Sequence, residues 1–290
     1  MTATADDADD FDRLWDYNHP AETEQRLRAL LPQMTEPSRR AELLTQIARA
    51  QGLQRRFEAA HATLDEVEPL LTSDHARPTI RYLLERGRVF NSSRQPEQAS
   101  SLFRQAWEQA RAAGQDFYAI DAAHMLAISE PPEHQLEWNL QALRLAEATS
   151  EPRGRGWRGS LYNNIGWTYH DQERYVEALE CFEKALLCRQ EAGDQSTIRI
   201  ARWCVARCLR SLGRVSEALA ILRELEAEHA AVGGSDGYVY EELAECLALN
   251  QDPAAQAYFA LAYAQLSADP WLAEAEPARL ERLRLLGAQQ

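Results

Sequence analysis

The chain has 290 residues, of which 45% are apolar and 26% charged, and its formal net charge at pH 7 is −14. This acidic balance argues against a nucleic-acid partner, because a large basic patch would be needed to overcome phosphate repulsion. An apolar run of about 18 residues, which a membrane-spanning helix needs, is missing, so no membrane partner is expected. The N-terminal MTATADDADDFD carries Asp where a secretion signal carries Lys or Arg, which favours a cytoplasmic location.

The first 31 residues predict an acidic tail followed by an incomplete helix pair. Residues 1–8 are polar and acidic, and we expect them to be disordered. Phe11, Leu14 and Trp15 then form a short apolar face, on which Trp15 is expected to cover the end of the core. Pro20 opens a helix that carries Leu27, since the missing N–H of Pro is tolerated in a first helical turn.

Six fuller units follow, each of which predicts two amphipathic helices joined by a turn. Their ranges are 38–74, 76–113, 116–150, 157–192, 194–232 and 236–268. Pro or Gly residues lie at the joints, where helices are expected to end. Beyond them, Pro277 starts a last helix whose Leu280, Leu283 and Leu286 share one face, with Arg and Glu residues off that face. An apolar inner face and a charged outer face are what the exposed end of a stacked array requires.

Side chains of one kind recur along these units at a nearly constant interval. A small residue of the first helix recurs as Ala48, Gly87, Ala127, Gly166, Ala206 and Ala244. The second helix repeats two columns, Ala60, Ala99, Asn139, Ala178, Ala218 and Gln256, and Leu64, Phe103, Leu143, Phe182, Leu222 and Ala260. Because one helix pair cannot bury both of its apolar faces, this repetition predicts that successive pairs stack.

The fullest unit carries Tyr162, Ile165, Gly166, Tyr169, Ala178, Phe182 and Ala185. This pattern resembles the tetratricopeptide repeat, whose signature is an aromatic residue, a Leu-Gly-like pair, a Tyr, an Ala, a Phe and another Ala. The unit around Gly87 also matches, although Arg86 stands where a Leu is expected, and Asn139 and Gln256 depart from the small-residue column. The resemblance covers roughly residues 4–270. The period near 40 is similar to the long-period type common in bacterial peptide-sensing proteins and kinesin-light-chain-like domains.

The resemblance implies an all-α fold, a right-handed superhelical solenoid of antiparallel helix pairs. One degenerate N-terminal unit and six full units would occupy residues 9–270, and residues 271–290 would form a C-terminal capping helix. The composition agrees, because Ala, Leu, Glu, Gln and Arg dominate and all are good helix formers. No sheet is expected, since alternating runs of Val, Ile and Thr are missing.

Catalytic motifs are missing from the sequence. It contains no HExxH, no GxSxG and no GxxxxGK[ST], and the acidic residues are spread over helix faces. The run from Gly154 to Gly159, GRGWRG, has no preceding strand, so we interpret it as a loop between repeats. We therefore expect no enzyme activity and no cofactor.

The cysteines predict buried thiols. Five of them, Cys181, Cys188, Cys204, Cys208 and Cys246, occur in a chain without a secretion signal, so disulfides are not expected. A thiolate metal site would require the first four to converge on one ion. Small buried thiols between helices are far more common, so no metal site is predicted.

The first helix of each pair lines the concave surface of such a solenoid, which makes its polar residues candidates for binding. From this register we predict a peptide-binding groove formed by Arg49, Arg81, Arg88, His124, Asn163, Asn164, Trp167, His170, Trp203, Arg207 and Arg210. Thr45, Gln46, Leu84, Glu85, Asn91, Met125 and Ile128 lie on the same face, which turns acidic at Glu241, Glu242 and Glu245. Arg beside Trp and Asn is typical of binding hot spots.

The resemblance also suggests roles for these side chains. Asn164 stands where family members with peptide-binding grooves often carry an Asn that pairs with a peptide backbone, a task that suits its amide. Arg88, Arg207 and Arg210 would clamp carboxylates bidentately, and the Trp residues would bury an apolar anchor. The alternative is that the Asn side chains face solvent and the Arg side chains pair with Glu at i±4 on the same helix.

We therefore predict a non-catalytic scaffold or adaptor that binds an extended, acidic or C-terminal peptide segment of another protein in its concave groove. One alternative is a peptide-sensing regulatory module acting through a protein partner, since residues 1–40 are too acidic for a DNA-binding helix-turn-helix. The other is a self-assembling structural solenoid. We expect a monomer or a weak homo-oligomer.

Overall fold

The structure, a computed structural model, describes residues 11–288. The acidic tail predicted for residues 1–8 lies outside them. The chain divides into two compact units, which meet in sequence at Trp157 and Arg158. Each unit is described by itself below, and the prediction of one continuous solenoid over residues 9–270 stays a prediction.

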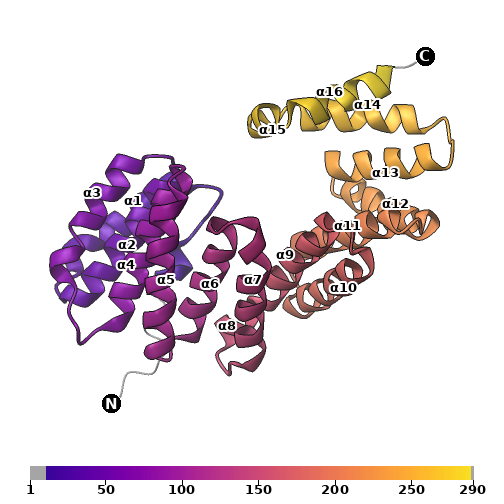
Figure 1. The fold of residues 1–290 in the computed structure, drawn as a ribbon. Coiled ribbons are helices and arrows are strands. Elements are labelled where there is room, and N and C mark those ends of the chain that lie inside the picture. The colour runs from indigo at the N-terminus through magenta and orange to yellow at the C-terminus, as the bar shows by residue number, and fades with distance from the viewer. Residues whose placement is uncertain (1–10, 289–290) are drawn as a thin grey trace. The chain divides into compact units, whose positions relative to one another are not determined.

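Unit 1 consists of helices that pack in chain order (Figure 1). They are α1 (Pro20–Leu30), α2 (Pro37–Leu53), α3 (Phe57–Asp65), α4 (Ala76–Ser92), α5 (Pro96–Ala112), α6 (Asp116–Ser129), α7 (Pro132–Ala148) and the short α8 (Pro152–Gly156). Short 3₁₀ turns lie at Asp12–Leu14, Leu31–Gln33 and Glu68–Leu70. The first helices of successive pairs, α2, α4 and α6, also contact one another, which makes the pairs layers of one stack.

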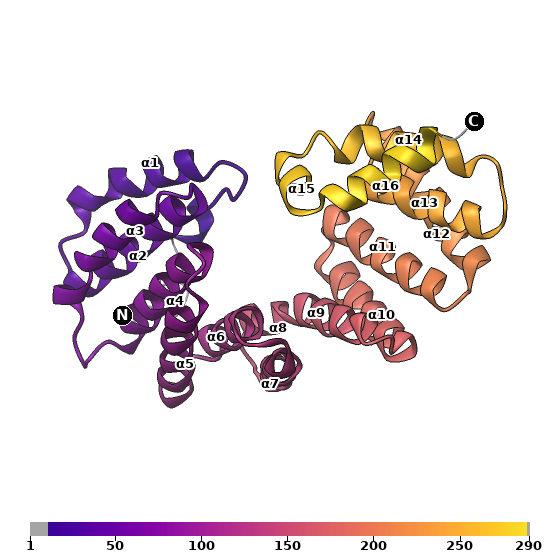
Figure 2. The ribbon, with the colours of Figure 1, turned by 45° about the horizontal axis from the view of Figure 1, so that its top comes forward.

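Unit 2 repeats this arrangement (Figure 2). Its helices are α9 (Arg158–Asp171), α10 (Tyr175–Ala192), α11 (Gln195–Ser211), α12 (Val215–Ala231), α13 (Gly237–Leu249), α14 (Ala255–Leu266), α15 (Pro270–Ala275) and α16 (Pro277–Ala288). Both views place α16 along α14, where Leu280 and Leu283 are buried. No strand occurs in residues 11–288, so the all-α prediction is confirmed. Over the same residues, no helix combines the length and the apolar character that crossing a membrane requires.

The close approach of the two helices in a pair depends on the small-residue column. A Cβ atom added at Gly87 would lie 2.5 Å from Phe103, and one added at Gly166 would lie 2.7 Å from Phe182. Both phenylalanines are fully buried against the glycine. Other units fill the same two columns with an Ala and a Leu, such as Ala206 with Leu222. The missing methyl group of the first helix is therefore compensated by a larger ring on the second.

Two residues that depart from the repeat pattern are buried in unit 1. Arg86 keeps 9% of its surface exposed, and its guanidinium donates to Asp65 at 2.5 Å and lies over the ring of Tyr82. Asn139 is 5% exposed, and its Oδ1 atom has no hydrogen-bond partner. The first departure is compensated by a polar network, whereas the second leaves a buried acceptor unpaired, a cost of about 1–3 kcal/mol.

The structure corrects the predicted register of the last second helix. Gln256 and Ala260 are exposed, while Ala255, Phe259 and Ala262 are buried. These three continue the spacing of Ala178, Phe182 and Ala185 through a repeat that is shorter than the preceding ones. The columns assigned to Gln256 and Ala260 were therefore wrong by one residue.

The stretch around Gly154 was also predicted incorrectly, because it is helical rather than a loop. Pro152 occupies the first turn of α8, and α9 begins at Arg158. Gly154 is buried, and a Cβ atom there would lie 2.8 Å from Thr149 and 3.2 Å from Ile120. The glycine thus serves close packing of a short helix on unit 1.

We expect Gly166→Ala to destabilise the chain by about 1–3 kcal/mol, because its methyl group overlaps the ring of Phe182. Phe182→Leu alone should also destabilise, since it leaves unfilled space beside Gly166. The double variant recreates the Ala206 and Leu222 combination, so its loss should be smaller than the sum of the single losses. Denaturant unfolding of the four proteins measures this coupling.

The control for this cycle is Gly156→Ala, because a Cβ atom at Gly156 meets no atom within 4 Å. It should leave the free energy of unfolding unchanged or slightly raised. Strictly additive losses in the double variant would contradict the proposed compensation.

Candidate functional site

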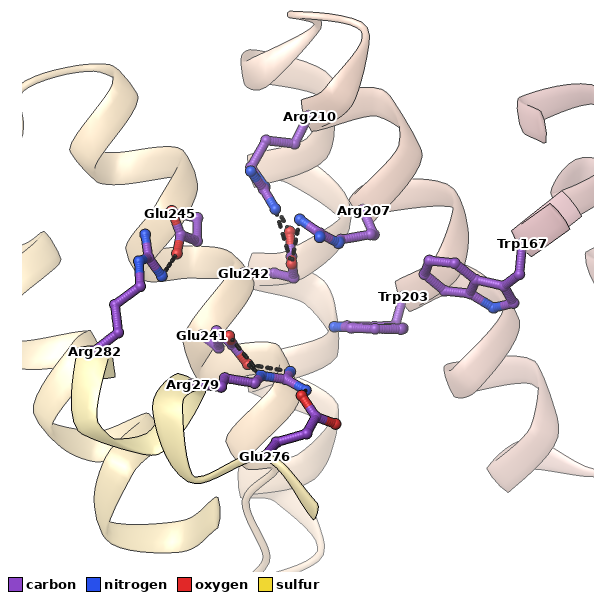
Figure 3. Close-up of a pocket in the computed structure, with 10 residues that line it drawn as sticks. All are labelled: Trp167, Trp203, Arg207, Arg210, Glu241, Glu242, Glu245, Glu276, Arg279 and Arg282. Atoms are coloured by element: carbon purple, nitrogen blue, oxygen red, sulfur yellow. Dashed lines mark hydrogen bonds and ion pairs between the residues drawn. The ribbon is translucent and has the colours of Figure 1, made fainter. Parts of the chain in front are cut away.

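The first helices of unit 2 surround a cavity of about 500 Å³ (Figure 3). Its lining comes from α9, α11, α13 and α16 and from the residue that precedes α16. These residues are Trp167, Trp203, Arg207, Arg210, Glu241, Glu242, Glu245, Glu276, Arg279 and Arg282. Four arginines therefore face four carboxylates.

Every arginine of this cavity is paired with a carboxylate of the same cavity. Arg210 binds Glu242 through two nitrogens, with Nε 2.7 Å from Oε2 and Nη2 3.2 Å from Oε1, and Arg207 reaches Oε1 at 3.2 Å. Figure 3 shows both side chains converging on Glu242 from α11. On the opposite wall, Arg279 Nε donates to Glu241 at 3.0 Å and Arg282 donates to Glu245. The formal charges cancel when all eight groups are ionised.

Glu242 is the most buried carboxylate of this cavity. It is 3% exposed, and burial raises the pKa of its carboxyl to about 7, although the Arg210 guanidinium opposes this shift. At neutral pH part of the population therefore carries an uncharged Glu242 beside two cationic guanidinium groups. An anionic ligand that enters the cavity competes with Glu242 for the guanidinium groups of Arg207 and Arg210, and the raised pKa of Glu242 makes this carboxyl easier to displace.

Trp203 separates the charged cavity from an apolar one. Its ring centroid lies 5.9 Å from that of Trp167 and 5.9 Å from that of Tyr238, and its Nε1 atom donates to the Tyr238 carbonyl at 3.1 Å. The second cavity, about 450 Å³, shares Trp203 and is lined by Ser196, Arg199, Ile200, His229, Asp236, Tyr238 and Val239. Ile200 is 58% exposed there, so an apolar surface lies beside paired charges.

Unit 1 contains a cavity of about 360 Å³ on its own first helices, α2, α4 and α6, near α8. Its lining is Tyr17, Gln46, Arg49, Arg81, Leu84, Glu85, Arg88, Phe117, Tyr118, Asp121, His124, Met125, Arg153 and Trp157. In contrast to the unit 2 cavity, four arginines here face only two carboxylates, those of Glu85 and Asp121.

Ion pairs join the layers of unit 1 as well. Glu85 Oε1 accepts from Arg49 at 3.1 Å and from Arg88 at 2.6 Å, and Arg88 also donates to both oxygens of Asp121. Burial disfavours the Asp121 anion, but the guanidinium groups of Arg88 and Arg49 outweigh it and hold the pKa of that carboxyl below its usual value. Arg81 reaches back to Glu42 on α2 at 3.2 Å.

Three polar atoms of residues that line this cavity have no hydrogen-bond partner. They are Arg49 Nε, Glu85 Oε2 and the Tyr118 hydroxyl. Tyr118 is 5% exposed and Glu85 is 4% exposed. Each such atom costs about 1–3 kcal/mol of stability compared with a paired one, which makes this cavity the most incompletely satisfied polar region among the described residues.

The structure brings together most of the predicted groove residues, but in two separate places. Arg49, Arg81, Arg88 and His124 line the unit 1 cavity, and Trp167, Trp203, Arg207 and Arg210 line the unit 2 cavity. The remaining three lie on α9 outside both linings. Asn163 Oδ1 accepts from Cys204 at 3.3 Å, the Asn164 carbonyl accepts from Thr168 at 3.1 Å, and His170 Nε2 lies 2.9 Å from the Ser211 hydroxyl.

The pairing of the arginines differs from both interpretations of the sequence. Arg88 meets Glu85 on its own helix, but Arg207 and Arg210 reach Glu242 on the next first helix rather than a residue at i±4. Arg279 and Arg282, which were placed off the apolar face of the last helix, line the cavity. A signal in the sequence could have identified them, because each lies 37 or 38 residues, about one repeat, after the carboxylate that it binds, Glu241 for Arg279 and Glu245 for Arg282.

The prediction of buried thiols is confirmed for Cys181, Cys204, Cys208 and Cys246 but wrong for Cys188, which is only partly buried because it lies on the outer part of the second helix α10. Burial raises the pKa of Cys204 and Cys246 to about 12 and that of Cys208 to about 11, so these thiols stay protonated at neutral pH. Within residues 11–288, no three His, Cys, Asp or Glu side chains are placed to hold a metal ion.

His124 should make the stability of unit 1 depend on pH. Burial lowers its pKa below the ordinary value near 6.5, although the nearby Asp121 opposes this. The unfolded chain therefore binds a proton more readily, and stability should fall as the pH drops below about 6.5. We expect His124→Gln to lose less thermal stability between pH 8.0 and pH 5.5 than the unsubstituted chain.

The matched control is His134→Gln on α7, where the side chain is exposed. It should keep the full pH dependence of the unsubstituted chain. Equal losses in the two variants, measured by circular dichroism melting, would contradict the role of His124.

Comparison with known proteins supports this architecture. The sequence pattern of the tetratricopeptide repeat matches residues 160–190. Among curated proteins, no sequence matches the chain significantly.

Solved structures resemble the chain more widely. BtubC from P. vanneervenii is 16% identical with a TM-score of 0.60, over 78% of this chain and 94% of that one. NprR in complex with its peptide NprX is 15% identical with a TM-score of 0.55, over 92% and 78%. A Rap protein complexed with competence and sporulation factor is 15% identical with a TM-score of 0.56, over 92% and 77%. The shared fold and the repeat match show that this chain is a helical repeat protein of the tetratricopeptide type.

Proposed function

We propose that the chain is a non-catalytic interaction module that binds an extended peptide segment of another protein, acidic or with its C-terminus, on the first helices of its pairs. The observation that carries this proposal is the position of Trp203, between a cavity rich in arginine and an apolar cavity. The NprR structure is a complex with its cognate peptide and the Rap structure a complex with competence and sporulation factor, which supports the same use of this fold.

The two cavities of unit 2 suit neighbouring side chains of one peptide. An apolar side chain fits against Ile200, Trp203 and Tyr238, where burial of apolar area favours binding. An adjacent acidic side chain then faces Arg207 and Arg210. Since both arginines already hold Glu242, the ligand carboxylate exchanges with that carboxyl, and the partial protonation of Glu242 lowers the cost of this exchange.

In this proposal Asn164 binds the backbone of the peptide. It lies half-buried on α9, three residues before Trp167, and its amide can pair with the backbone of an extended peptide. Asn163 and His170 lie on the same helix and contact Cys204 and Ser211, respectively.

Affinity selection from a random peptide library tests the proposal. Peptides enriched on the unsubstituted chain should carry an apolar residue next to Asp or Glu. We expect Trp203→Ala and Arg207→Ala to weaken their binding by about tenfold or more, because they remove the apolar wall and one guanidinium of the exchange site. Asn164→Ala should also weaken it. Isothermal titration of the selected peptides measures these changes.

The matched control is Arg223→Ala, since Arg223 lies on the second helix α12, pairs with Glu226 and lines neither cavity. It should bind the selected peptides with unchanged affinity. Enriched peptides that bind all four variants equally would remove the basis for the groove assignment.

A peptide-sensing regulator acting through a protein partner is the second candidate, favoured by the resemblance to NprR and Rap. Both candidates predict that a selected peptide raises the melting temperature. Only the sensor predicts that the peptide also changes the affinity of the chain for a second protein, which pull-downs from the host with and without peptide would reveal.

A further inference from the structure

We propose that the apolar cavity of unit 2 is a subsite for a tyrosine side chain, whose hydroxyl group is recognised by His229 and Asp236. The inference deepens the proposed function, on which it rests, because it names the side chain that the peptide places against Trp203. It concerns the apolar cavity alone and does not depend on how the arginines of the neighbouring cavity are used.

The cavity lies between the first half of α11, the end of α12 and the start of α13. Ile200 and Trp203 come from α11, His229 comes from α12, and Asp236 is the residue that precedes α13. The volume of about 450 Å³ is within the range of ligand cavities in proteins. An aromatic ring with a polar tip fits such a space, whereas the short side chains of Ser and Thr would leave most of it empty.

Two aromatic rings form a corner of this cavity. The centroids of Trp203 and Tyr238 lie 5.9 Å apart, and the planes of the two rings meet at 73°. A ligand ring that stacks on one of them therefore meets the other in an edge-to-face arrangement, which aromatic pairs favour. Ile200 beside them is largely exposed, so a ligand ring finds apolar area to bury.

His229 and Asp236 form a polar pair in this cavity without a direct hydrogen bond. His229 Nε2 lies 3.8 Å from Asp236 Oδ2, a separation that is too long for such a bond. The other oxygen of Asp236 is used within the chain, because Oδ1 accepts from the backbone N–H groups of Tyr238 at 2.8 Å and Val239 at 3.3 Å and so caps α13. The two side chains are 19% and 35% exposed, so a ligand can reach both.

A phenol hydroxyl completes this pair in a way that the side chains of Trp and Phe cannot. Its oxygen accepts one hydrogen bond and donates another, so with a proton on His229 Nε2 it accepts there and donates to Asp236 Oδ2. The 3.8 Å separation lets one oxygen lie within about 3 Å of both atoms. The indole N–H of Trp only donates, and the ring of Phe has no polar tip. The cavity therefore selects tyrosine by its hydroxyl group as well as by its ring.

Neutral single-residue probes separate these side chains. The hydroxyl of N-acetyl-tyrosinamide accepts and donates, its O-methyl ether only accepts, the ring of N-acetyl-tryptophanamide only donates, and the ring of N-acetyl-phenylalaninamide does neither. None of them has a carboxylate, so none binds the arginines as an anion. We expect N-acetyl-tyrosinamide to bind the full chain with a millimolar dissociation constant, and the other three to bind at least about fivefold more weakly, because each loses a hydrogen bond. Ligand-observed NMR titration measures these affinities.

Asp236→Asn is the informative variant. Asn caps a helix as well as Asp does, so the fold should be kept, but its amide nitrogen takes the place of the acceptor oxygen that faces His229. We expect the affinity for N-acetyl-tyrosinamide to fall by about fivefold and that for N-acetyl-phenylalaninamide to stay unchanged. His229→Phe should remove the preference for the tyrosine probe in the same way. A merely structural role of either residue would lower both affinities together.

The matched control is Asp194→Asn. Asp194 caps α11 by accepting from the backbone N–H groups of Ser196 and Thr197, and it lies outside the cavity lining. This variant carries the same change of charge at the same position of a helix. It should keep the full preference for the tyrosine probe.

Equal binding of the tyrosine and phenylalanine probes, an unchanged preference in Asp236→Asn, or no binding of any probe at about 10 mM would overturn the inference. Selected peptides that require Trp203 and Arg207 but carry Leu or Phe as often as Tyr beside the acid would leave the proposed function standing and remove only this specificity. Failure to select any peptide, with the tyrosine probe bound as expected, would remove the peptide function and leave the hydroxyl contact.

Discussion

The two helices of a pair approach closely because one of them lacks a side chain at the crossing. At Gly166 and Gly87 the facing ring occupies the space in which a Cβ atom would lie. This contact commits one face of the first helix to its partner, and stacking commits the flanking faces to the neighbouring pairs. The face that is left carries the polar and aromatic residues of both cavities, so the position of the candidate sites follows from the packing of the pairs.

Arginines on this remaining face link one layer to the next. Arg210 and Arg207 hold a carboxylate of the following first helix, and Arg88 does the same with Asp121. Burying such charges is costly unless both partners are present and well oriented. The pairs therefore serve the stack as well as recognition, and a ligand that uses these arginines competes with the chain itself.

The two cavities differ in how their arginines are paired and in what surrounds them. In unit 2 the charges balance and an apolar surface adjoins them across Trp203, an arrangement suited to an apolar side chain beside an exchangeable acid. In unit 1 the lining arginines are paired as well, Arg81 with Glu42 outside the lining, but buried atoms of Arg49, Glu85 and Tyr118 are unpaired. No residue belongs to the linings of both the unit 1 cavity and the unit 2 cavity with the paired charges.

The sequence by itself determined the paired helices and the helix face that carries the candidate residues, since apolar periodicity is a local property that recurs in each repeat. It missed the short helix α8, whose five residues are too few to show such a period. It could not determine which carboxylate each arginine meets, because the partner lies one repeat away and the spacing of the layers selects it. For the same reason it did not identify Arg279 and Arg282 as cavity residues. It also assigned Gln256 to the small-residue column in place of Ala255, because the last repeat is shorter than the others. The unpaired atoms of Glu85 and Tyr118 were decided only by tertiary structure, since a missing partner is a property of the folded surroundings and leaves no mark on the order of the residues.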